Sequence, residues 1–407
     1  MTSENIRSLF PELKQTVYGK PLVYLDNAAT SQRPLQVIEK WNEMSSKLNS
    51  NLHRAVHHIA DLATEEFEST RAAVATFIGA PSPKNIVFTS GATHSLNLVA
   101  FSFGEAFVHE DDEIIVCESE HHSNIVPWQM MAARKKARIT VLPVEDDGTV
   151  DPAGLKALIN PKTRLVCIAH ISNVLGIENP VKEIVNICHS NSCPILIDGA
   201  QGIVHSSVNV TDLDCDFYLF SGHKIYAAPG TGVLYAKDKW LESMPPYMGG
   251  GEMIGTVTWG NTTYAPWPHK FEAGTQNIAG IPTLKPALAL AKEFDCPEIK
   301  DNQRAIIEYV LDEFKARKNI TLYGNPSDRN LKVPVFSISV EGAHHEDLAL
   351  ILDKMGIAVR SGQMCAEPLM DRFGVTGMLR ASFAPYNTLE EAEYFIKSLD
   401  RAVKMLG

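Results

Sequence analysis

A lysine that could act as a nucleophile follows a short apolar run near the middle of the chain, in the segment Ser221-Gly222-His223-Lys224. In an open parallel sheet, ligands bind at the carboxyl ends of the strands. A partly desolvated lysine amine at such a place can form a Schiff base. For this tetrapeptide alone, a surface lysine beside a turn is the alternative. The other polar residues at the same edge of the sheet therefore decide the chemistry.

An acid ends a second apolar run, Ile195-Leu196-Ile197-Asp198, and Gly199-Ala200-Gln201 follows it. A carboxylate at the end of a buried strand can pair with a protonated pyridinium nitrogen and keep that ring electron-withdrawing. The alternative is that Asp198 caps the N-terminus of the next helix. Lysine and acid together favour a cofactor site.

A turn that could bind phosphate lies earlier in the chain, where Phe88-Thr89-Ser90-Gly91-Ala92-Thr93 leads from a predicted strand into a predicted helix over His94–Phe103. The free amides of a helix N-terminus bind phosphate. An ordinary strand-to-helix connection has the same residue types. The turn indicates a phosphate site only in combination with the lysine and the acid.

One of the seven cysteines differs from the rest. Cys365 lies in a glycine-containing stretch between Val359 and Pro368, near Arg360, where mobility and positive charge favour an exposed, reactive thiolate. We expect the other six to be small buried hydrophobic residues. The odd total of seven cysteines and the lack of a CxxC pair exclude a disulfide framework, and we expect no metal site.

These residues require an α/β fold. Apolar runs alternate with helix-length stretches, which predicts βαβ units around a mainly parallel, seven-stranded sheet with helices on both faces. The predicted strands are Ile86–Thr89, Ile114–Cys117, Ile139–Leu142, Leu165–Ala169, Pro194–Asp198, Phe217–Phe220 and Val233–Ala236.

After about residue 285 the pattern changes to amphipathic helices over Asn302–Arg317 and Thr388–Met405, around strand-like Val333–Val340 and Ile357–Arg360. Thr388 and Glu391 form a predicted capping box. We therefore expect an N-terminal segment (1–20) packing with the small domain, a large cofactor-binding domain (21–290) and a small α+β C-terminal domain (291–407) that carries the Cys365 loop.

Composition narrows the class of protein further. The 407 residues are 45% hydrophobic and 21% charged, as in globular proteins. A net charge of -11 argues against nucleic-acid binding. Neither the charged segment Met1–Leu13 nor any later run has the apolar length of a signal peptide or a membrane helix, so we expect no membrane association and a cytoplasmic location.

The motifs, taken in order, resemble those of a known family. The set looks like the fold-type-I, pyridoxal 5'-phosphate (PLP) dependent enzymes of the class V aminotransferase group, and within it the group II (Suf-type) cysteine desulfurases, over nearly the whole chain. The residues that carry the resemblance are Gly91-Ala92-Thr93, Glu120-His121-His122-Ser123-Asn124, Ser172-Asn173-Val174, Asp198-Gly199-Ala200-Gln201, Ser221-Gly222-His223-Lys224 and Arg360-Ser361-Gly362-Gln363-Met364-Cys365.

The resemblance implies a role for each site residue. Lys224 would be the Schiff-base lysine and proton shuttle, Asp198 the pyridinium partner, His122 the ring-stacking residue and Cys365 the sulfur acceptor. The other expected cofactor contacts are Gln201 at the phenolic oxygen, Thr93, Ser221 and His223 at the phosphate, and Thr275 at the phosphate of a second subunit in a homodimer. The expected substrate contacts are Asn173, Arg380, His53 and Arg360.

The implied function is that of a cysteine desulfurase, which converts L-cysteine to L-alanine and passes the sulfur from a Cys365 persulfide to an acceptor protein of the SufE or SufU kind, for iron-sulfur cluster assembly. A selenocysteine lyase acting on L-selenocysteine is the second interpretation, and a non-catalytic sulfur-carrier scaffold the third. A dinucleotide-binding oxidoreductase is disfavoured because no GxGxxG follows the first strand.

Three positions differ from the Suf-type pattern. Met364 stands where a histidine usually precedes the cysteine, His94 where an acid usually follows the glycine-containing turn, and Ala227-Ala228-Pro229 where glycine-proline-threonine is usual. The first two bear on thiol activation and on communication between subunits.

Overall fold

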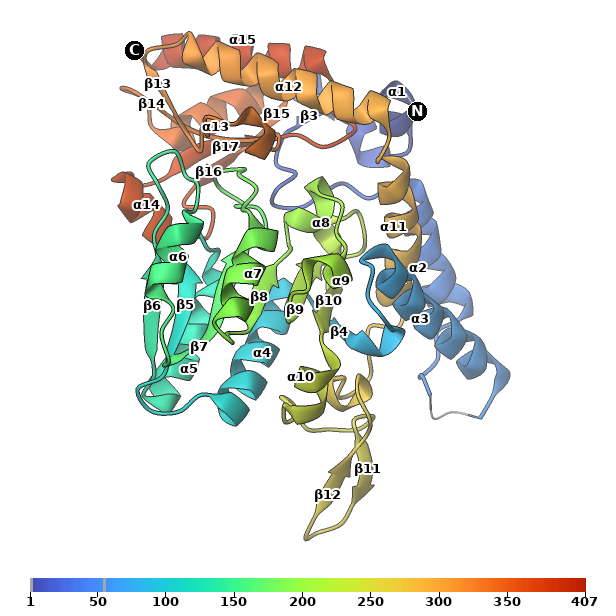
Figure 1. The fold of residues 1–407 in the computed structure, drawn as a ribbon. Helices are drawn as coiled ribbons and strands as arrows, with labels where there is room; N and C mark the ends of the chain where they lie inside the picture. Colours follow the sequence, from blue (N-terminus) through green and yellow to red (C-terminus); the bar gives the residue numbers. More distant parts are fainter. Residues whose placement is uncertain (1–2, 54–55) are drawn as a thin grey trace.

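A seven-stranded sheet organises the larger part of the molecule (Figure 1). The computed structural model describes residues 3–53 and 56–407. Neighbouring strands run in the order β4-β10-β9-β8-β7-β5-β6, and all pairs are parallel except those that β10 makes. The predicted α/β class and mainly parallel sheet are confirmed. The strands are β4 (Ile86–Thr89), β5 (Glu113–Cys117), β6 (Arg138–Leu142), β7 (Thr163–Ala169), β8 (Ile195–Asp198), β9 (Phe217–Ser221) and β10 (Gly232–Ala236).

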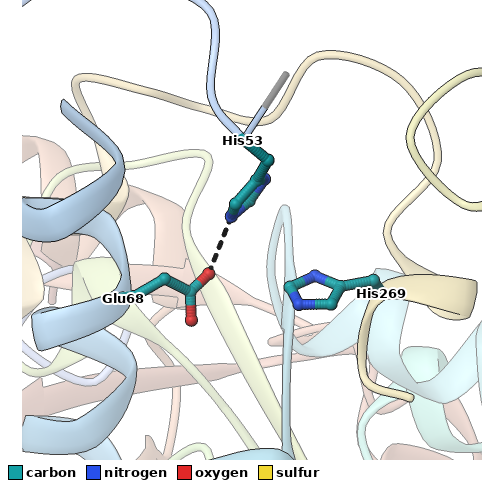
Figure 2. Close-up of side chains that lie close together, drawn as sticks. All are labelled: His53, Glu68 and His269. Carbon is teal, nitrogen blue, oxygen red and sulfur yellow. Dashed lines mark hydrogen bonds and ion pairs between the residues drawn. The ribbon is translucent and has the colours of Figure 1, made fainter. Parts of the chain in front are cut away.

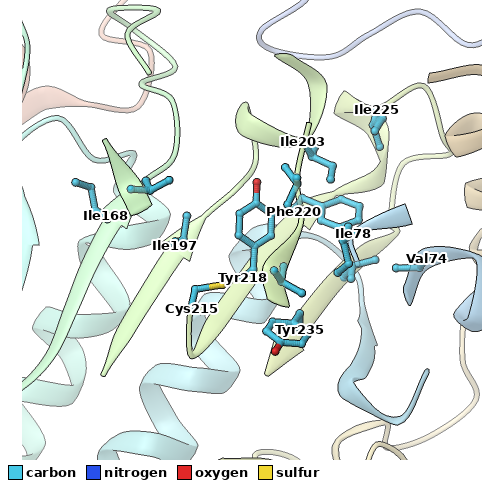
Figure 3. Close-up of a cluster of buried hydrophobic side chains, with 14 of the residues drawn as sticks. Val74, Ile78, Ile168, Ile197, Ile203, Cys215, Tyr218, Phe220, Ile225 and Tyr235 are labelled. Carbon is cyan, nitrogen blue, oxygen red and sulfur yellow. The ribbon is translucent and has the colours of Figure 1, made fainter. Parts of the chain in front are cut away.

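Both faces of this sheet are buried, as the uninterrupted apolar runs predict. Along β5, Ile114 and Val116 join one hydrophobic cluster while Ile115 and Cys117 join the other. Figure 3 shows part of the cluster that contains Ile115 and Cys117, with Tyr218 and Phe220 of β9 among its side chains. Alternate side chains of each strand therefore enter opposite layers of the core.

Helices cover the two faces. One layer contains α4 (Ala92–Phe107), α5 (Val126–Lys135) and α10 (Asp238–Ser243). The opposite layer contains α3 (His58–Phe77), α7 (Val181–Ser190) and α11 (Leu284–Glu293), with α2 (Leu35–Lys47) packed beside α11. The shorter helices of this half are α6 (Pro152–Leu158), α8 (Gly202–His205) and α9 (Val210–Leu213).

The C-terminal part forms a second, four-stranded sheet in the order β13-β14-β17-β16. Its strands are β13 (Ile320–Tyr323), β14 (Val335–Val340), β16 (Arg360–Gly362) and β17 (Met378–Ser382), and its helices are α12 (Pro297–Lys315), α13 (His345–Lys354), α14 (Glu367–Phe373) and α15 (Leu389–Leu406). The short strands β3 (Val23–Tyr24) and β15 (Ile357–Ala358) pair in parallel beside it. The predicted domain division at residue 290 stays a prediction.

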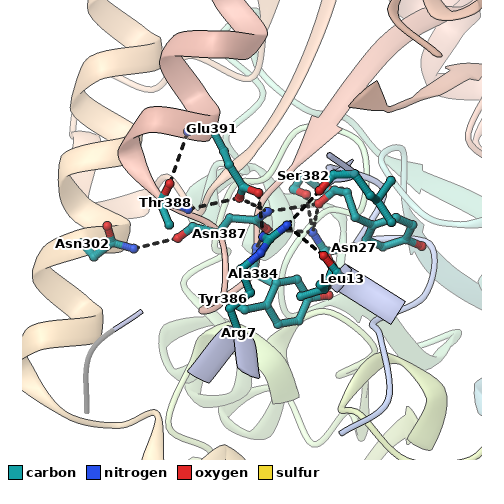
Figure 4. Close-up of polar contacts among 12 residues, drawn as sticks. Arg7, Leu13, Asn27, Asn302, Ser382, Ala384, Tyr386, Asn387, Thr388 and Glu391 are labelled. Carbon is teal, nitrogen blue, oxygen red and sulfur yellow. Dashed lines mark hydrogen bonds and ion pairs between the residues drawn. The ribbon is translucent and has the colours of Figure 1, made fainter. Parts of the chain in front are cut away.

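The N-terminal segment, with α1 (Ser3–Ser8), packs against the C-terminal part (Figure 4). Arg7 donates to Glu391 at 2.6 Å and to Leu22 O at 2.8 Å. Glu391 also completes the predicted capping box with Thr388, which begins α15 and is confirmed. One carboxylate therefore holds together a helix start and a segment 384 residues away in sequence.

A hairpin of β11 (Ile254–Val257) and β12 (Thr262–Tyr264) projects from the body of the molecule and was not predicted (Figure 1). Most of its residues are exposed, so no buried periodicity marks it in the sequence. A small two-stranded sheet of β1 (Thr16–Val17) and β2 (Lys20–Pro21) completes the fold. No helix among residues 3–53 and 56–407 has the length and apolar character needed to cross a membrane.

A buried ion pair joins α3 to the segment after β12. Arg71 donates to both carboxylate oxygens of Glu272, at 2.6 and 2.9 Å, and their side chains are 1% and 2% exposed. Glu272 also accepts from Phe88 N of β4 at 2.7 Å. Burial alone would raise the pKa of Glu272, but the Arg71 charge holds it below its usual value.

Removing one partner of this pair is expected to be costly. Arg71→Met should lower the free energy of unfolding by about 3–5 kcal/mol, because Glu272 would remain as an uncompensated buried charge. Urea denaturation measures this change. Lys397→Met, which breaks the exposed pair with Glu393, is the control and should change stability by less than about 1 kcal/mol. Equal effects in the two variants would contradict the prediction.

Candidate active site

A cavity of about 230 Å³ opens where the carboxyl ends of the parallel strands approach the C-terminal sheet. Parallel strands direct their terminal side chains to one edge, so residues distant in sequence meet there. Ten of the predicted site residues line it: Thr93, Asn173, Asp198, Gln201, Ser221, His223, Lys224, Arg360, Cys365 and Arg380. The predicted His53, His122 and Thr275 are absent from its lining.

The lysine and the acid of this cavity influence each other. Burial lowers the pKa of Lys224 to about 8, against the opposing effect of the Asp198 charge. Burial raises the pKa of Asp198, and the Lys224 charge opposes that rise. Within the described part of the chain, Asp198 accepts one side-chain hydrogen bond, from Ala200 N at 2.9 Å. The carboxylate therefore keeps acceptor capacity for a cation or an N–H group inside the cavity.

At one end of the cavity, the start of α4 meets the end of β9. Ala92 N donates to Ser221 Oγ at 2.8 Å, and Thr93 stands exposed in the first turn of the helix. Gly91 packs closely on Gly232, where a Cβ would lie 2.4 Å from the Gly91 Cα. The 16-residue helix α4 directs its free amides into this end of the cavity, which suits an anionic group.

The two adjacent histidines after β5 face different surroundings. His121 lines the cavity, and burial, with the nearby Lys224 charge, lowers its pKa to about 4. His122 instead accepts a hydrogen bond through Nε2 from Glu367 N, at the start of α14, at 3.0 Å. The neutral imidazole beside the cavity therefore belongs to His121, and the sequence prediction chose its neighbour.

The loop that carries Cys365 is held by its main chain. Asn173 Nδ2 donates to Met364 O at 3.0 Å, and His122 N donates to Cys365 O at 2.7 Å. Met364 and Cys365 both have positive φ, 52° and 56°, a conformation unusual for residues other than glycine. Met364 is buried, whereas Cys365 is exposed. The loop thus buries one side chain in order to present the other at the cavity.

Two arginines approach the cavity from the C-terminal sheet. Arg380 is 2% exposed and donates through Nη1 to Asn173 O at 2.8 Å. Both Arg380 and Arg360 form ion pairs with Asp26, at 3.2 and 3.3 Å. Gln201 donates to Ala28 O at 2.7 Å, and His223 Nδ1 lies 3.2 Å from Thr30 Oγ1. The N-terminal segment 26–30 therefore forms part of the site.

His53 lies outside this cavity, beside Glu68 and His269 (Figure 2). The possible ligand atoms of these three residues lie within 4.8 Å of one another. Glu68 accepts from His53 Nε2 at 3.0 Å, and Arg71 donates to both Glu68 oxygens, at 2.8 and 3.1 Å. Arg71 is shared between Glu68 and Glu272, so the cluster is part of a larger ion-pair network. Thr275 is exposed, beyond the cavity lining.

Sequence reasoning missed two residues of the site. His121 was quoted in a motif, but only the 3-10 turn His122–Asn124, whose backbone Ser123 N donates to His121 Nδ1 at 3.1 Å, decides which histidine faces inward. Asp26 follows β3 and carries no local signal of its partners. Its two arginines are more than 330 residues away in sequence.

Comparisons with known proteins agree with this geometry. A model of the family described as aminotransferase class-V matches residues 23–395. A probable cysteine desulfurase of Vibrio cholerae is 44% identical over 98% of both chains, and a cysteine desulfurase of Cronobacter sakazakii is 45% identical over 99% of both. The crystal structure of the cysteine desulfurase CsdA from Escherichia coli has a TM-score of 0.91 at 36% identity and covers 100% of both chains.

The sheet, with its lysine and acid at the ends of neighbouring strands, has the fold of the fold-type-I PLP-dependent transferases. The chain belongs to the aminotransferase class-V family. The resemblance drawn from the motifs is therefore confirmed. This family is PLP-dependent in general.

The exposure of Cys365 predicts selective labelling. Iodoacetamide should modify Cys365 first in the native protein, because five other cysteines are buried and Cys296 is half-buried. Burial raises the pKa of Cys117, Cys193 and Cys215 to about 12, so they hold almost no thiolate at neutral pH. Peptide mass spectrometry after brief labelling identifies the modified thiol. Faster labelling of a buried cysteine would contradict the exposure seen here.

Proposed function

We propose that this protein is a PLP-dependent cysteine desulfurase that converts L-cysteine to L-alanine and retains the sulfur as a persulfide on Cys365. The observation that carries the proposal is the meeting of Lys224, Asp198 and Cys365 at one cavity. The relatives at 44% and 45% identity bear cysteine desulfurase names, which supports this substrate. A scaffold without turnover would need no buried amine and acid at the same cavity.

The residues of the cavity fit PLP. The Asp198 carboxylate has acceptor capacity for a pyridinium N–H, and the start of α4 with Ser221 and Thr93 offers donors for a phosphate. We propose His121, in place of the earlier His122, as the stacking residue, because its neutral ring lines the cavity. Gln201 and His223 complete the proposed cofactor contacts. Lys224 supplies the amine that binds the aldehyde.

Different residues of the cavity have separate roles in the proposed reaction. Arg380 and Asn173 would hold the substrate carboxylate, with Arg360 nearby. PLP, when bound, withdraws electrons from the α-carbon and so weakens the bond between Cβ and sulfur. Lys224 removes the α-proton and returns protons to carbon. The Cys365 thiolate attacks the substrate sulfur, the Cβ–S bond breaks, and its electron pair stays with the carbon skeleton, which leaves as alanine.

The fate of the sulfur extends the proposal beyond this chain. Cys365 is exposed, so a second protein can approach the persulfide and accept its sulfur through a thiol of its own. We propose a SufE-like or SufU-like acceptor, iron-sulfur cluster assembly as the pathway, and action in the cytoplasm. We also propose a homodimer in which exposed Thr275 contacts the phosphate in the partner subunit, with His53 near the same interface.

Replacing the sulfur acceptor is the first test. Cys365→Ser should lower L-cysteine turnover at least about a hundredfold, because an entire covalent step is lost. Alanine and sulfide are measured together, and mass spectrometry should find one added sulfur on the Cys365 peptide of the parent protein. Cys296→Ser, a half-buried cysteine outside the cavity lining, is the matched control and should retain activity.

The same variant separates sulfur from selenium chemistry. Selenium leaves carbon more readily, so Cys365→Ser should retain far more selenocysteine turnover than cysteine turnover. If the variant loses turnover of both substrates equally, the cause is a general defect in the site, and the role of Cys365 as sulfur acceptor is contradicted. Persulfide on Cys117 or Cys215 in the parent protein would overturn the choice of acceptor.

A pH series tests the cofactor lysine. Since only a neutral amine attacks an aldehyde, and since burial lowers the pKa of Lys224 to about 8, PLP capture by the apoprotein should accelerate as pH rises from 7 to 9 and then level off. Absorbance of the bound cofactor follows the rate. Free Nα-acetyllysine, with its pKa near 10.4, should still be accelerating above pH 9. Lys224→Arg should capture none.

A further inference from the structure

Two like charges stand opposite each other in the C-terminal sheet. Arg360 of β16 and Arg380 of β17 are direct register partners, and both line the cavity. Like charges directly opposite in an antiparallel pair repel and destabilise it. Arg380 is 2% exposed, so its charge is also poorly solvated, and burial lowers the pKa of its guanidinium. Such a pair requires a counter-ion.

Asp26 is that counter-ion. Its Oδ1 lies 3.2 Å from Arg380 Nη2, and its Oδ2 lies 3.3 Å from Arg360 Nη1. One carboxylate therefore bridges the two guanidinium groups with one oxygen for each. The Asp26 side chain is 19% exposed, so solvent screens this bridge only in part.

The backbone fixes Asp26 in this place. Residue 26 forms a parallel bridge with Ser382, at the end of the strand that carries Arg380. Ser382 N and Ser382 Oγ both donate to Leu25 O, at 2.7 and 3.1 Å. The carboxylate and the guanidinium thus project from two chain segments that are hydrogen-bonded to each other, and the bridge requires little side-chain ordering.

The hydrogen bonds of Arg380 leave room for a ligand. A guanidinium has five N–H donors. Nη1 donates to Asn173 O and Nη2 donates to Asp26, while Nε has no partner in the described structure. Each terminal nitrogen therefore retains one N–H that a ligand carboxylate can accept. Asn173 O and Asp26 restrain the guanidinium through its two terminal nitrogens.

We propose that Asp26 is a positioning residue for the substrate carboxylate: it fixes the plane of the Arg380 guanidinium and neutralises its repulsion by Arg360. This inference rests on the proposed function, since it assigns the Arg380 guanidinium to the carboxylate of an amino-acid substrate. Asp26 itself need not contact the substrate. It acts through Arg380, and its influence is confined to ligands that carry a carboxylate.

Asp26→Asn tests the proposal, because asparagine keeps the shape and removes the charge. We expect KM for L-cysteine to rise about tenfold, the scale of one charge-assisted hydrogen bond, while kcat changes less than about twofold. Lys224 and Cys365, which act on the bonds that break, are untouched. Asp146→Asn, an exposed aspartate paired with Arg372 outside the cavity, is the control and should leave both constants unchanged.

Two inhibitors separate positioning from general damage. L-Alanine has the carboxylate, whereas L-alaninamide has a neutral amide in its place. In Asp26→Asn the inhibition constant for alanine should rise in step with KM, and that for alaninamide should stay the same. A damaged site would weaken both inhibitors equally, and that outcome, like an unchanged KM, would overturn the proposal.

These measurements distinguish failure of the Asp26 role from failure of the proposed function. If the parent protein forms no alanine from cysteine, the proposed function fails. If the parent is active and the ratio of the two inhibition constants is the same in parent and variant, only the role of Asp26 fails. Should Asp26→Asn not fold, the same ratio is measured in Asp26→Glu, where the charge remains but is displaced by one methylene. A higher alanine-to-alaninamide ratio supports positioning, and an unchanged ratio overturns it.

Discussion

The site depends on opposite charges buried at the ends of neighbouring strands. Asp198 ends β8, and Lys224 follows β9, which pairs with β8 in parallel. Burial disfavours the charged form of both groups, and each partly offsets that effect for the other. Without a nearby positive charge, a carboxylate buried at this depth would take up a proton and become neutral. The parallel register of the sheet, which brings both strand ends to one edge, is therefore what makes the chemistry of the cavity possible.

The C-terminal part of the molecule completes the cavity through its backbone as much as through its side chains. Asn173, after β7, donates to Met364 O and accepts from Arg380, so it contacts both the thiol loop and the arginine proposed to bind the substrate carboxylate. His122 holds the same loop from the end of β5. These hydrogen bonds join the two sheets and hold the Cys365 loop beside the strand ends of the large sheet.

The sequence predicted what depends on burial and local hydrogen bonding. All seven strands of the large sheet and the capping box at Thr388 were predicted, because most of these strands are buried on both faces and largely apolar, and because a capping box is local. The exposed hairpin of β11 and β12 has no such signal. His121 was not predicted because a turn conformation decides which histidine faces the cavity. Asp26 was not predicted because its partners are far away in the sequence.

A second buried acid shows how the cavity controls its charge. Glu120 accepts from Ala169 N at 2.7 Å and from Asn124 Nδ2 at 2.6 Å, in the loop that precedes His121. Burial and the Asp198 charge raise the pKa of Glu120 to about 8, so it is mostly protonated at neutral pH. Two adjacent buried carboxylates would repel each other, and protonating Glu120 removes that repulsion. Of these two acids, Asp198 is then the one that carries the negative charge, where the proposed pyridinium requires it.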